Sequence, residues 1–353
     1  MVYFMSCCKH NLTLPNEMLR NIGLVFRGFE VKFSTNASRV SVPHEDIATK
    51  VLKVAVIGVP NVGKSTFINN LMDRKVCPAS SKVHTTRAKS QAIFTEGDSQ
   101  IVFLDTPGLV SFQEYKKFSL EKSFLKDSKS SLREADIIGV IHDASNIWTR
   151  EKLDIKVIRL LEDNKTKPSF LVLNKVDIIK SKRKLLDVTR QLTENCIEGA
   201  PIPGGKPLRD KETRGWPHFS DVFMVSALTG SGLDEVKNYL IRNAKPGEWP
   251  YPGEIWSDKT AEEIIVDSVK AKLLDFLPQE IPYTLKPEME FFNINDKGVI
   301  SAVVLVHCPS KRIAQLVAGE SEGKLRQINE SLQVDLQRTF HNYVRIKVVL
   351  SDK

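Results

Sequence analysis

The segment Gly58–Ser65 combines residue types and spacing that suit phosphate binding. It reads Gly-Val-Pro-Asn-Val-Gly-Lys-Ser, fits the pattern G-x-x-x-x-G-K-[ST], and stands between an apolar run and a helical pattern. Glycines let backbone N–H groups surround phosphate oxygens, Lys64 places its charge beside the β- and γ-phosphates, and the Ser65 hydroxyl can bind Mg²⁺. The nucleotide-binding residues expected here are Gly58, Asn61, Val62, Gly63, Lys64, Ser65 and Thr66. The pattern predicts a nucleoside triphosphate and leaves the base open.

A second segment, Asp105–Gly108, reads Asp-Thr-Pro-Gly and ends an apolar run. Because the carboxyl ends of parallel strands meet at one edge of a sheet, we expect Asp105 beside the phosphate loop, where it can hold Mg²⁺ through water. The Gly108 N–H can then donate to the γ-phosphate. This segment therefore predicts the metal side of the same site.

Two further strand ends narrow the base to guanine. Asn174–Asp177 reads Asn-Lys-Val-Asp, and we expect Asn174, Lys175 and Asp177 to contact the nucleotide. The Asp177 carboxylate can accept both the N1 and N2 hydrogens of guanine, a pair that adenine does not offer, so the discrimination would be strong. Ser226 and Ala227 end the last apolar run, where the Ala227 N–H can reach the guanine O6.

Short apolar runs alternate with helical patterns between residues 50 and 245. This alternation predicts an α/β domain with a mostly parallel sheet and helices on both faces. A stretch rich in Pro, Gly and charge, Gly199–Arg214, is expected to be a surface loop inserted before the last strand. The expected strands are Val51–Ile57, Ile101–Leu104, Ile137–Ile141, Phe170–Leu173 and Val222–Val225, and the expected helices include Ser65–Met72, Lys152–Glu162 and Leu233–Asn243.

Prolines and glycines in Pro246–Gly253 mark a boundary, after which an α+β pattern begins. The turn Asn295–Gly298 predicts a hairpin between two of its strands. The expected order is helix Ala261–Phe276, strand Tyr283–Asn293, strand Val299–His307, helices Lys311–Val317 and Lys324–Phe340, and strand Val344–Leu350. The domains expected are a tail over 1–49, a nucleotide-binding domain over 50–245 and a second domain over 246–353.

The four motifs in this order resemble those of the translation-factor-like GTPases and, within them, the Era family. The resemblance covers residues 50–353 and implies a P-loop GTPase that binds GTP, GDP and Mg²⁺ and hydrolyses GTP to GDP and phosphate. His84–Arg87 resembles the switch I segment, with Thr86 favoured over Thr85 as the second Mg²⁺ hydroxyl. The catalytic residues implied are Lys64, Thr86, Asp105 and Gly108, and the metal ligands implied are Ser65, Thr86 and Asp105.

Two residues bear on the rate of hydrolysis. Leu109 follows the Asp-Thr-Pro-Gly segment, at the place where Ras-like enzymes have a glutamine that orients water. Since leucine cannot orient water, we expect slow intrinsic hydrolysis. In related families a residue that matches Asn61 helps to hold K⁺, so the resemblance implies K⁺ dependence. The alternative that Asn61 only shapes the loop stays open.

The element order after residue 246 resembles the RNA-binding KH domain of the Era family, which grips RNA with a G-x-x-G loop. Here Gly319–Gly323 has three residues between the glycines, and two of them are acidic. These carboxylates would repel phosphate, whereas nearby cations would attract it. The RNA-binding residues implied are Lys311, Arg312, Gly319, Gly323, Lys324 and Arg326. A helix pair that serves only as a protein surface is the alternative.

The first forty residues hold five basic and two acidic side chains and end in a Ser/Thr-rich stretch. This composition is typical of a mitochondrial presequence, although an ordinary disordered tail fits it equally well. With the inserted loop, the tail resembles mitochondrial members of the Era family. That resemblance implies a monomer in the mitochondrial matrix that binds small-subunit rRNA near its 3′ end and supports small-subunit assembly. Peripheral association with the inner membrane is left open.

Composition excludes several other classes of protein. The 353 residues are 41% hydrophobic and 27% charged, which excludes disordered, collagen-like and coiled-coil proteins. The five cysteines form no C-x-x-C pair, which argues against a disulfide framework and a zinc site. No apolar run is long enough to span a bilayer. The net charge is +8, but residues 50–245 carry 33 basic and 23 acidic side chains whereas residues 246–353 carry 13 and 16. Charge therefore does not identify the second domain as an RNA binder. For the basic stretches Lys116–Lys129 and Lys180–Lys184 of the nucleotide-binding domain, a solvated helix face is the favoured interpretation, and a functional contact is the alternative.

Two rival functions remain beside the GTPase. One is a binding module for RNA or protein whose nucleotide only stabilises the fold, without significant turnover. The other is a membrane-associated or tRNA-modifying GTPase. Against the tRNA-modifying enzymes stands the absence of a C-terminal cysteine motif and of a separate cofactor domain in this sequence.

Overall fold

The computed structural model describes residues 48–77, 90–105, 130–202, 215–278 and 280–352. All of them belong to one compact unit that begins at Glu45. Within the described ranges, no helix is long and apolar enough to cross a membrane. The amino-terminal tail and the basic stretch Lys116–Lys129 lie outside these ranges.

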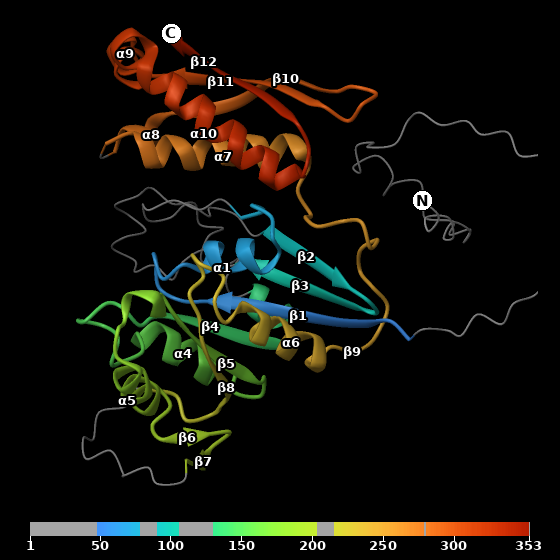
Figure 1. The fold of residues 1–353 in the computed structure, drawn as a ribbon, viewed down its shortest axis with the longest axis vertical. Coiled ribbons are helices and arrows are strands. Elements are labelled where there is room, and N and C mark those ends of the chain that lie inside the picture. The colour runs from blue at the N-terminus through green and yellow to red at the C-terminus, as the bar shows by residue number, and fades with distance from the viewer. Residues whose placement is uncertain (1–47, 78–89, 106–129, 203–214, 279, 353) are drawn as a thin grey trace, which may run out of the picture. The chain divides into compact units, whose positions relative to one another are not determined.

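A seven-stranded sheet forms the first half of the fold (Figure 1), in the order β2-β3-β1-β4-β5-β8 with β9 paired to β1. Strands β1, β3, β4, β5 and β8 run parallel, as the alternating pattern predicts, and β2 and β9 run antiparallel to their neighbours. The strands are β1 (Lys50–Ile57), β2 (Ser90–Glu96), β3 (Ser99–Asp105), β4 (Ile137–Asp143), β5 (Ser169–Asn174), β8 (Phe219–Met224) and β9 (Lys245–Pro246).

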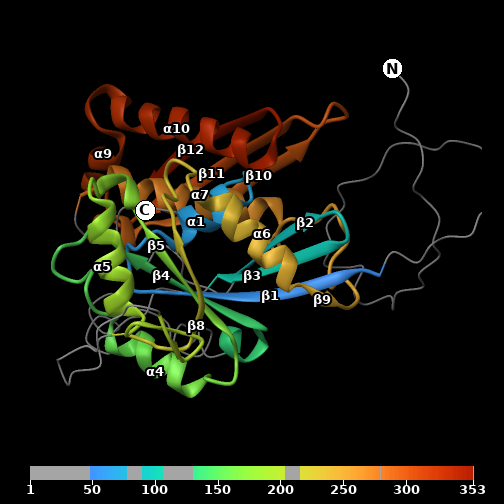
Figure 2. The same cartoon turned by 60° about the horizontal axis from the view of Figure 1, so that its bottom comes forward.

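Helices cover the sheet on both faces, as Figure 2 shows from another side. Helices α1 (Lys64–Leu71) and α6 (Leu233–Asn243) pack on one face, where Phe67 and Tyr239 join the core. Helices α4 (Ile155–Asp163) and α5 (Lys182–Leu192) pack on the other, where Leu161 and Val188 are buried. The carboxyl ends of the parallel strands therefore meet at one edge of a sheet that is buried on both sides.

Several strands before residue 245 differ from the sequence expectation. Strand β2 was not expected, because its sequence Ser-Gln-Ala-Ile-Phe-Thr-Glu is half polar and it lies at the edge of the sheet. Strand β8 lies at the other edge, and Met224 within it is 38% exposed, so it is not a strand buried on both faces. In the expected inserted loop, Ala200–Pro201 forms strand β7, which pairs with β6 (Cys196–Ile197). Residues 203–214 of that loop lie outside the described ranges.

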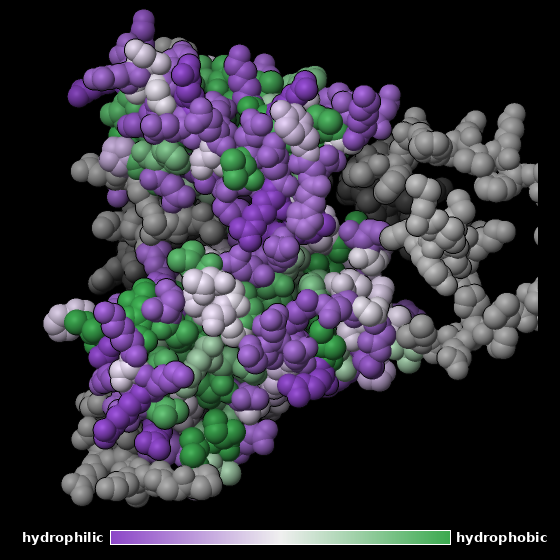
Figure 3. Space-filling model, viewed as in Figure 1, coloured by the Kyte–Doolittle hydropathy of each residue, from purple (hydrophilic) through white to green (hydrophobic). Residues whose placement is uncertain are grey.

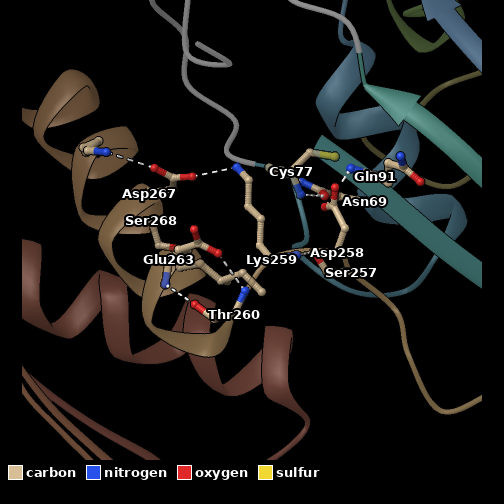
Figure 4. A network of polar contacts seen from close by, with 12 residues as sticks. Asn69, Cys77, Gln91, Ser257, Asp258, Lys259, Thr260, Glu263, Asp267 and Ser268 are labelled. Atoms are coloured by element: carbon tan, nitrogen blue, oxygen red, sulfur yellow. Dashed lines mark hydrogen bonds and ion pairs between the residues drawn. The ribbon is translucent and has the colours of Figure 1, made fainter. Parts of the chain in front are cut away.

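The chain stays attached to the first sheet beyond β9. The Trp249 indole donates to the Lys50 carbonyl at 3.1 Å, and the Tyr251 hydroxyl donates to Gln91 at 2.8 Å. At the end of this segment the Asp258 carboxylate accepts from the Gln91 backbone N–H at 2.8 Å (Figure 4). Residues 247–258 are therefore held to β1 and β2 of the first sheet.

The second sheet has the order β10-β11-β12, antiparallel between β10 and β11 and parallel between β11 and β12. The order of helices and strands matches the expected α+β pattern, and Figure 3 shows a mostly hydrophilic surface over α7 and α10. The elements are α7 (Ala261–Phe276), α8 (Ile281–Thr284), β10 (Lys286–Ile294), β11 (Ile300–Cys308), α9 (Lys311–Ala318), α10 (Gly323–Phe340) and β12 (Val344–Asp352). The expected strand Tyr283–Asn293 is wrong at its start, because Pro282 opens the helical turn α8.

Helix α7 begins at a capping box drawn in Figure 4. The Thr260 hydroxyl accepts from the Glu263 N–H at 3.2 Å, and the Glu263 carboxylate accepts from the Thr260 N–H at 2.9 Å. Such reciprocal bonds satisfy N–H groups that a helix start leaves without partners. Lys259, which precedes the cap, pairs with Asp267 at 2.7 Å and fixes the direction in which the chain enters the helix.

Residues at the end of α1 contact α10. The Thr339 carbonyl accepts from the Arg74 guanidinium at 3.1 Å, and Arg338 donates to the Asn70 side-chain oxygen at 3.2 Å. Asp335 pairs with Lys75 at 2.6 Å and with Lys272 of α7 at 2.7 Å. The helix that follows the phosphate loop is thus joined by polar contacts to the second sheet's main helix.

Candidate functional site

The phosphate loop lies between β1 and α1, where its glycines are required by geometry. Gly63 precedes α1 with φ of 97°, and a Cβ there would lie 2.4 Å from the Asn174 amide nitrogen. A Cβ at Gly58 would lie 2.5 Å from the Ile141 carbonyl oxygen. Any side chain at these positions would collide, so the loop can lie against β4 and β5 only because both residues are glycine.

Lys64 is the first residue of α1 and is only 8% exposed. Its ammonium donates to the carbonyl oxygens of Gly58 at 3.1 Å and Val59 at 3.2 Å, so it lies across the loop. Those carbonyls hold the charge where phosphate oxygens would meet it. Ser65 and Thr66 follow in the first turn and are half-buried, and Val62 is buried beneath the loop.

Asn174, the last residue of β5, joins two loops of the site. Its amide donates to the Val62 carbonyl at 2.7 Å, and its oxygen accepts from the Ala227 N–H at 2.9 Å. Asn174 is 2% exposed, so both bonds are shielded from water. The side chain therefore holds the phosphate loop and the Ser226–Ala227 loop in a fixed relation.

Lys175 forms a second set of polar contacts across the site. With φ of 63°, it directs its ammonium to the Asn61 carbonyl at 2.9 Å and to the Asp143 carboxylate at 2.6 Å. Partial burial by itself raises the pKa of Asp143, but Lys175 and the hydrogen bonds from Ser145 hold it below its ordinary value. Asp143 therefore stays ionised, and Lys175 contributes to loop position beside any contact with a nucleotide.

The geometry of Ala227 differs from the expected role. Its N–H donates to Asn174, so it is not free for a guanine O6 in this arrangement, and its carbonyl accepts from the Asn70 amide of α1. Ser226 is 1% exposed and its hydroxyl accepts from the Thr229 N–H at 3.3 Å, which shapes the turn before α6. Asp177, by contrast, is exposed at the same edge of the sheet and is open to a base.

The remaining expected ligands are only partly covered by the structure. Asp105 is the last residue of β3, beside β1, at the edge where the phosphate loop begins. Thr85, Thr86, Gly108 and Leu109 lie outside the described residues. The strand that carries Asp105 is therefore placed as predicted, and the roles of the other four stay predictions.

The six expected RNA-binding residues fall into two groups. Lys311 and Arg312 are exposed at the first turn of α9, whereas Gly319 and the residues after it lie at its other end, about 12 Å away along the helix. Gly319 has φ of 74°, and a Cβ there would lie 2.7 Å from the Lys324 Cβ. Gly323 has no neighbour within 4 Å of a Cβ and belongs to α10, so only the first glycine is required.

Glu322 and Ser321 within that loop have φ of 59° and 48°, values that non-glycine residues seldom adopt. Glu320 and Glu322 are exposed beside exposed Arg326, and Lys324 is half-buried. The acidic loop and its cations therefore lie at one end of α9. Lys311 and Arg312 do not lie beside the loop.

Sequence reasoning missed two residues of the nucleotide site. Asp143 ends β4 just as Asp105 and Asn174 end their strands, so the strand-end pattern could have identified it. Asn70 carries no such signal, because an asparagine within a helix usually faces solvent. Its contacts become visible only when the Ser226–Ala227 loop and α10 are both in place.

A parallel sheet with a glycine-bounded loop, a buried lysine at a helix start and an exposed aspartate in an Asn-Lys-x-Asp segment at its carboxyl edge defines a P-loop GTPase. A protein-family model described as "50S ribosome-binding GTPase" matches residues 53–175.

The zebrafish (Danio rerio) protein named "GTPase Era, mitochondrial" is 38% identical over 340 residues, covering 87% of this chain and 76% of the relative. A salmon (Salmo salar) protein of the same name is 35% identical over 357 residues, covering 88% and 78%. The chain belongs to the Era family of GTPases.

The solved structure of Era with MgGDPNP and nucleotides 1506–1542 of 16S ribosomal RNA shares the fold, with a TM-score of 0.68. That structure is 24% identical in sequence and matches 86% of this chain and 94% of its own. Since its match runs through the second sheet as well as the first, both halves of the fold are those of Era.

Proposed function

We propose that this GTPase is a nucleotide-dependent switch that binds small-subunit rRNA near its 3′ end and supports assembly of the mitochondrial small ribosomal subunit. The observation that carries the nucleotide part is Asn174, which fixes two loops around a buried Lys64. The RNA part is supported by family membership and by the Era structure solved with a 16S rRNA segment.

The residues present fit GTP with Mg²⁺. The glycines let the phosphate loop lie against β4 and β5, and Lys64 donates to two carbonyl oxygens of that loop. Ser65, Thr86 and Asp105 are the proposed metal ligands, and Gly108 the proposed γ-phosphate donor. The metal would neutralise charge on the triphosphate. We also propose that Asn61 favours K⁺ and that hydrolysis is slow, because Leu109 cannot orient water.

In the proposed division, residues 50–245 bind the nucleotide and residues 246–353 contain a KH-like RNA-binding domain, with residues 247–258 hydrogen-bonded to the first sheet. Residues 1–49 would be a presequence that directs a monomer to the mitochondrial matrix. This location agrees with the names of the zebrafish, salmon and worm relatives. Peripheral association with the inner membrane would follow from contact with ribosomes there.

Crosslinking of the protein to RNA in intact cells, followed by sequencing of the bound RNA, tests the partner. Small-subunit rRNA near its 3′ end should be enriched. Enrichment of messenger or transfer RNA instead would refute the assembly role. Binding of that RNA should also be tighter with a non-hydrolysable GTP analogue than with GDP, by about 1–3 kcal/mol of coupling. Equal affinities in both nucleotide states would refute the switch.

Base selection has its own test, the substitution Asp177→Asn. The mutant amide can donate to the xanthine O2, so preference should shift from GTP toward xanthosine triphosphate. Full GTP affinity in the mutant would show that Asp177 does not read guanine. Turnover above background with K⁺ and RNA separates the switch from a binding module in which nucleotide only stabilises the fold.

A further inference from the structure

Trp148, in the turn between β4 and α4, is 83% exposed. The other three tryptophans of the chain, Trp216, Trp249 and Trp256, are buried or half-buried. Hydrogen bonds hold the turn in place, since the Asn146 side chain accepts from the Trp148 N–H at 3.0 Å and its carbonyl accepts from the Arg150 N–H at 2.8 Å. The indole is therefore presented to solvent by an ordered turn.

Exposed cations gather at the start of α5. Lys182 and Arg183 occupy the first turn of α5, Lys180 precedes it, and the first turn has no acidic residue. Positive charges are unfavourable at a helix amino-terminus, where the dipole and free N–H groups favour anions. Among the described residues, the ion pair in this turn is that of Lys184, which leaves these three cations facing solvent. The arrangement lowers helix stability unless an anion binds there.

The turn and the start of α5 form one surface. They follow strands β4 and β5, which pair in parallel with Asp143 opposite Asn174. Lys184 of α5 pairs with Glu151 of the turn at 2.6 Å, and Lys175 pairs with Asp143 at 2.6 Å. At the lower left of Figure 3, over α5 and the turn beside it, hydrophilic residues border hydrophobic ones. We call this the Trp148 surface, made of Trp148, Lys152, Lys180, Lys182 and Arg183.

A flat aromatic face beside several solvent-facing cations suits single-stranded nucleic acid, whose bases stack while phosphates bind the cations. A membrane-surface helix would need its main apolar face exposed. Leu186 of α5 and Ile147 beside Trp148 are exposed, but the apolar face of α5 formed by Leu185, Val188 and Leu192 is buried in the core. Protein interfaces are depleted of lysine at their centre, whereas three of the five residues here are lysines. Charge and shape together favour RNA over either alternative.

We propose that the Trp148 surface binds single-stranded RNA, with a base stacked on the Trp148 indole and phosphates bound by Lys152, Lys180, Lys182 and Arg183. This would be a second RNA contact, on the nucleotide-binding half of the chain and apart from α9 and α10. It does not depend on whether the acidic loop after α9 binds RNA. An RNA held there would lie next to the residues that follow Asp177, at the edge of the nucleotide site.

Tryptophan fluorescence tests the stacking directly, because Trp148 is exposed whereas the other three tryptophans are buried or half-buried. Titration of the full chain with a short oligouridylate should quench part of the emission, and duplex RNA of the same length should quench less. The quench should vanish in Trp148→Phe. A quench that persists in this variant would arise from another tryptophan and would overturn the stacking.

Charge substitutions that keep Trp148 allow affinity to be read from the same quench. The double variant Lys182→Ala with Arg183→Ala should bind the oligouridylate with an affinity lower by about fivefold or more. The slope of log Kobs against log salt should fall in magnitude by about 0.7 for each phosphate that the variant no longer binds. The matched control is Arg159→Ala with Lys165→Ala, which removes the same charges from exposed positions on and after α4. Affinity and salt slope should stay unchanged in the control.

Three outcomes would overturn the proposal. One is equal loss of affinity in both double variants, which would mean a general charge effect. Another is a blue shift of Trp148 emission with anionic phosphatidylserine vesicles and no quench with RNA, which would identify a membrane surface. The third is absence of either response, which would leave a protein partner. Nucleotide affinity serves as the fold control in every variant.

Discussion

At the scale of single residues, the nucleotide site depends on a few side chains that hold backbone loops rather than ligand. Asn174 is the main one, because both of its hydrogen bonds end on backbone atoms of loops distant in sequence. Lys175 acts similarly through Asn61 and Asp143. Substitutions here should therefore change stability and nucleotide affinity together.

Asn174→Ala should lower the free energy of unfolding by about 2–4 kcal/mol, since a buried carbonyl at Val62 and a buried N–H at Ala227 lose their partners. GDP affinity should fall as well. Urea unfolding of the nucleotide-free chain measures the first effect, and titration with a fluorescent GDP analogue measures the second.

Asn164→Ala is the matched control for that substitution. Its amide donates to the Leu160 carbonyl at 2.9 Å at the end of α4, away from the nucleotide site. We expect a loss of less than about 1 kcal/mol and no change in GDP affinity. Similar losses from both substitutions would show that Asn174 has no special role in the loops.

His142 gives the fold a pH dependence. It is buried in β4, and burial lowers its pKa below 6.5, although the Arg150 carbonyl at 3.1 Å and nearby Asp143 favour the proton. Below pH 6.5, His142 therefore binds a proton more readily in the unfolded chain than in the folded chain. Stability should be full above that pH and should fall as pH drops, by up to about 1.4 kcal/mol per unit until the folded pKa is reached.

Urea unfolding between pH 7.5 and 5 measures this slope. His142→Gln should flatten it, since glutamine keeps a donor for the Arg150 carbonyl and does not titrate. His218→Gln is the control, because His218 is exposed in the turn before β8. An unchanged slope in His142→Gln would assign the pH dependence to other groups.

At the scale of elements, helices α6 and α7 were predicted with the bounds observed: α7 begins at the Thr260–Glu263 capping box, and α6 follows Gly232. Helix α5 was not among the named helices, because its cationic first turn conceals the apolar period that begins at Leu185. Strand β2 and hairpin β6–β7 are stabilised by their neighbours in space rather than by their own sequences. The motifs at strand ends were predictable, whereas the partner of Ala227 was not.

Helix α7 offers a test of its cap. Thr260→Val should lower the free energy of unfolding by about 1 kcal/mol, because the Glu263 N–H at the helix start loses its acceptor. Thr260→Ser keeps the hydroxyl and should change stability much less. Thermal or urea unfolding of the two variants makes the comparison, and equal losses would assign the effect to side-chain packing.

At the scale of the whole molecule, residues 247–258 belong structurally with the first sheet although they follow its last strand. Thr49 and Gly247 exchange hydrogen bonds at 2.8 and 2.9 Å, and Trp249 and Tyr251 bond to residues of β1, β2 and β3. A nucleotide-binding fragment should therefore include this segment.

Two truncations test this point. A fragment that ends at Lys259 should bind GDP and unfold with higher stability than one that ends at Pro246, by about 3 kcal/mol or more, since several hydrogen bonds of about 1 kcal/mol each are kept. Neither fragment should bind the 3′-end RNA through the second domain. Equal stability of the two fragments would show that residues 247–258 contribute nothing to the sheet.

The central position of β1 has a consequence for synthesis. Among the described strands it is the first to leave the ribosome, yet its partner β4 begins only at Ile137, and the Thr49–Gly247 contact closes a separation of 198 residues. Pairings this distant make folding slow and leave strand edges open meanwhile. During translation, the amino-terminal end of β1 has no β9 partner until Pro246 has been made. Throughout this period a chaperone has access to a strand whose side chains are later buried in the core.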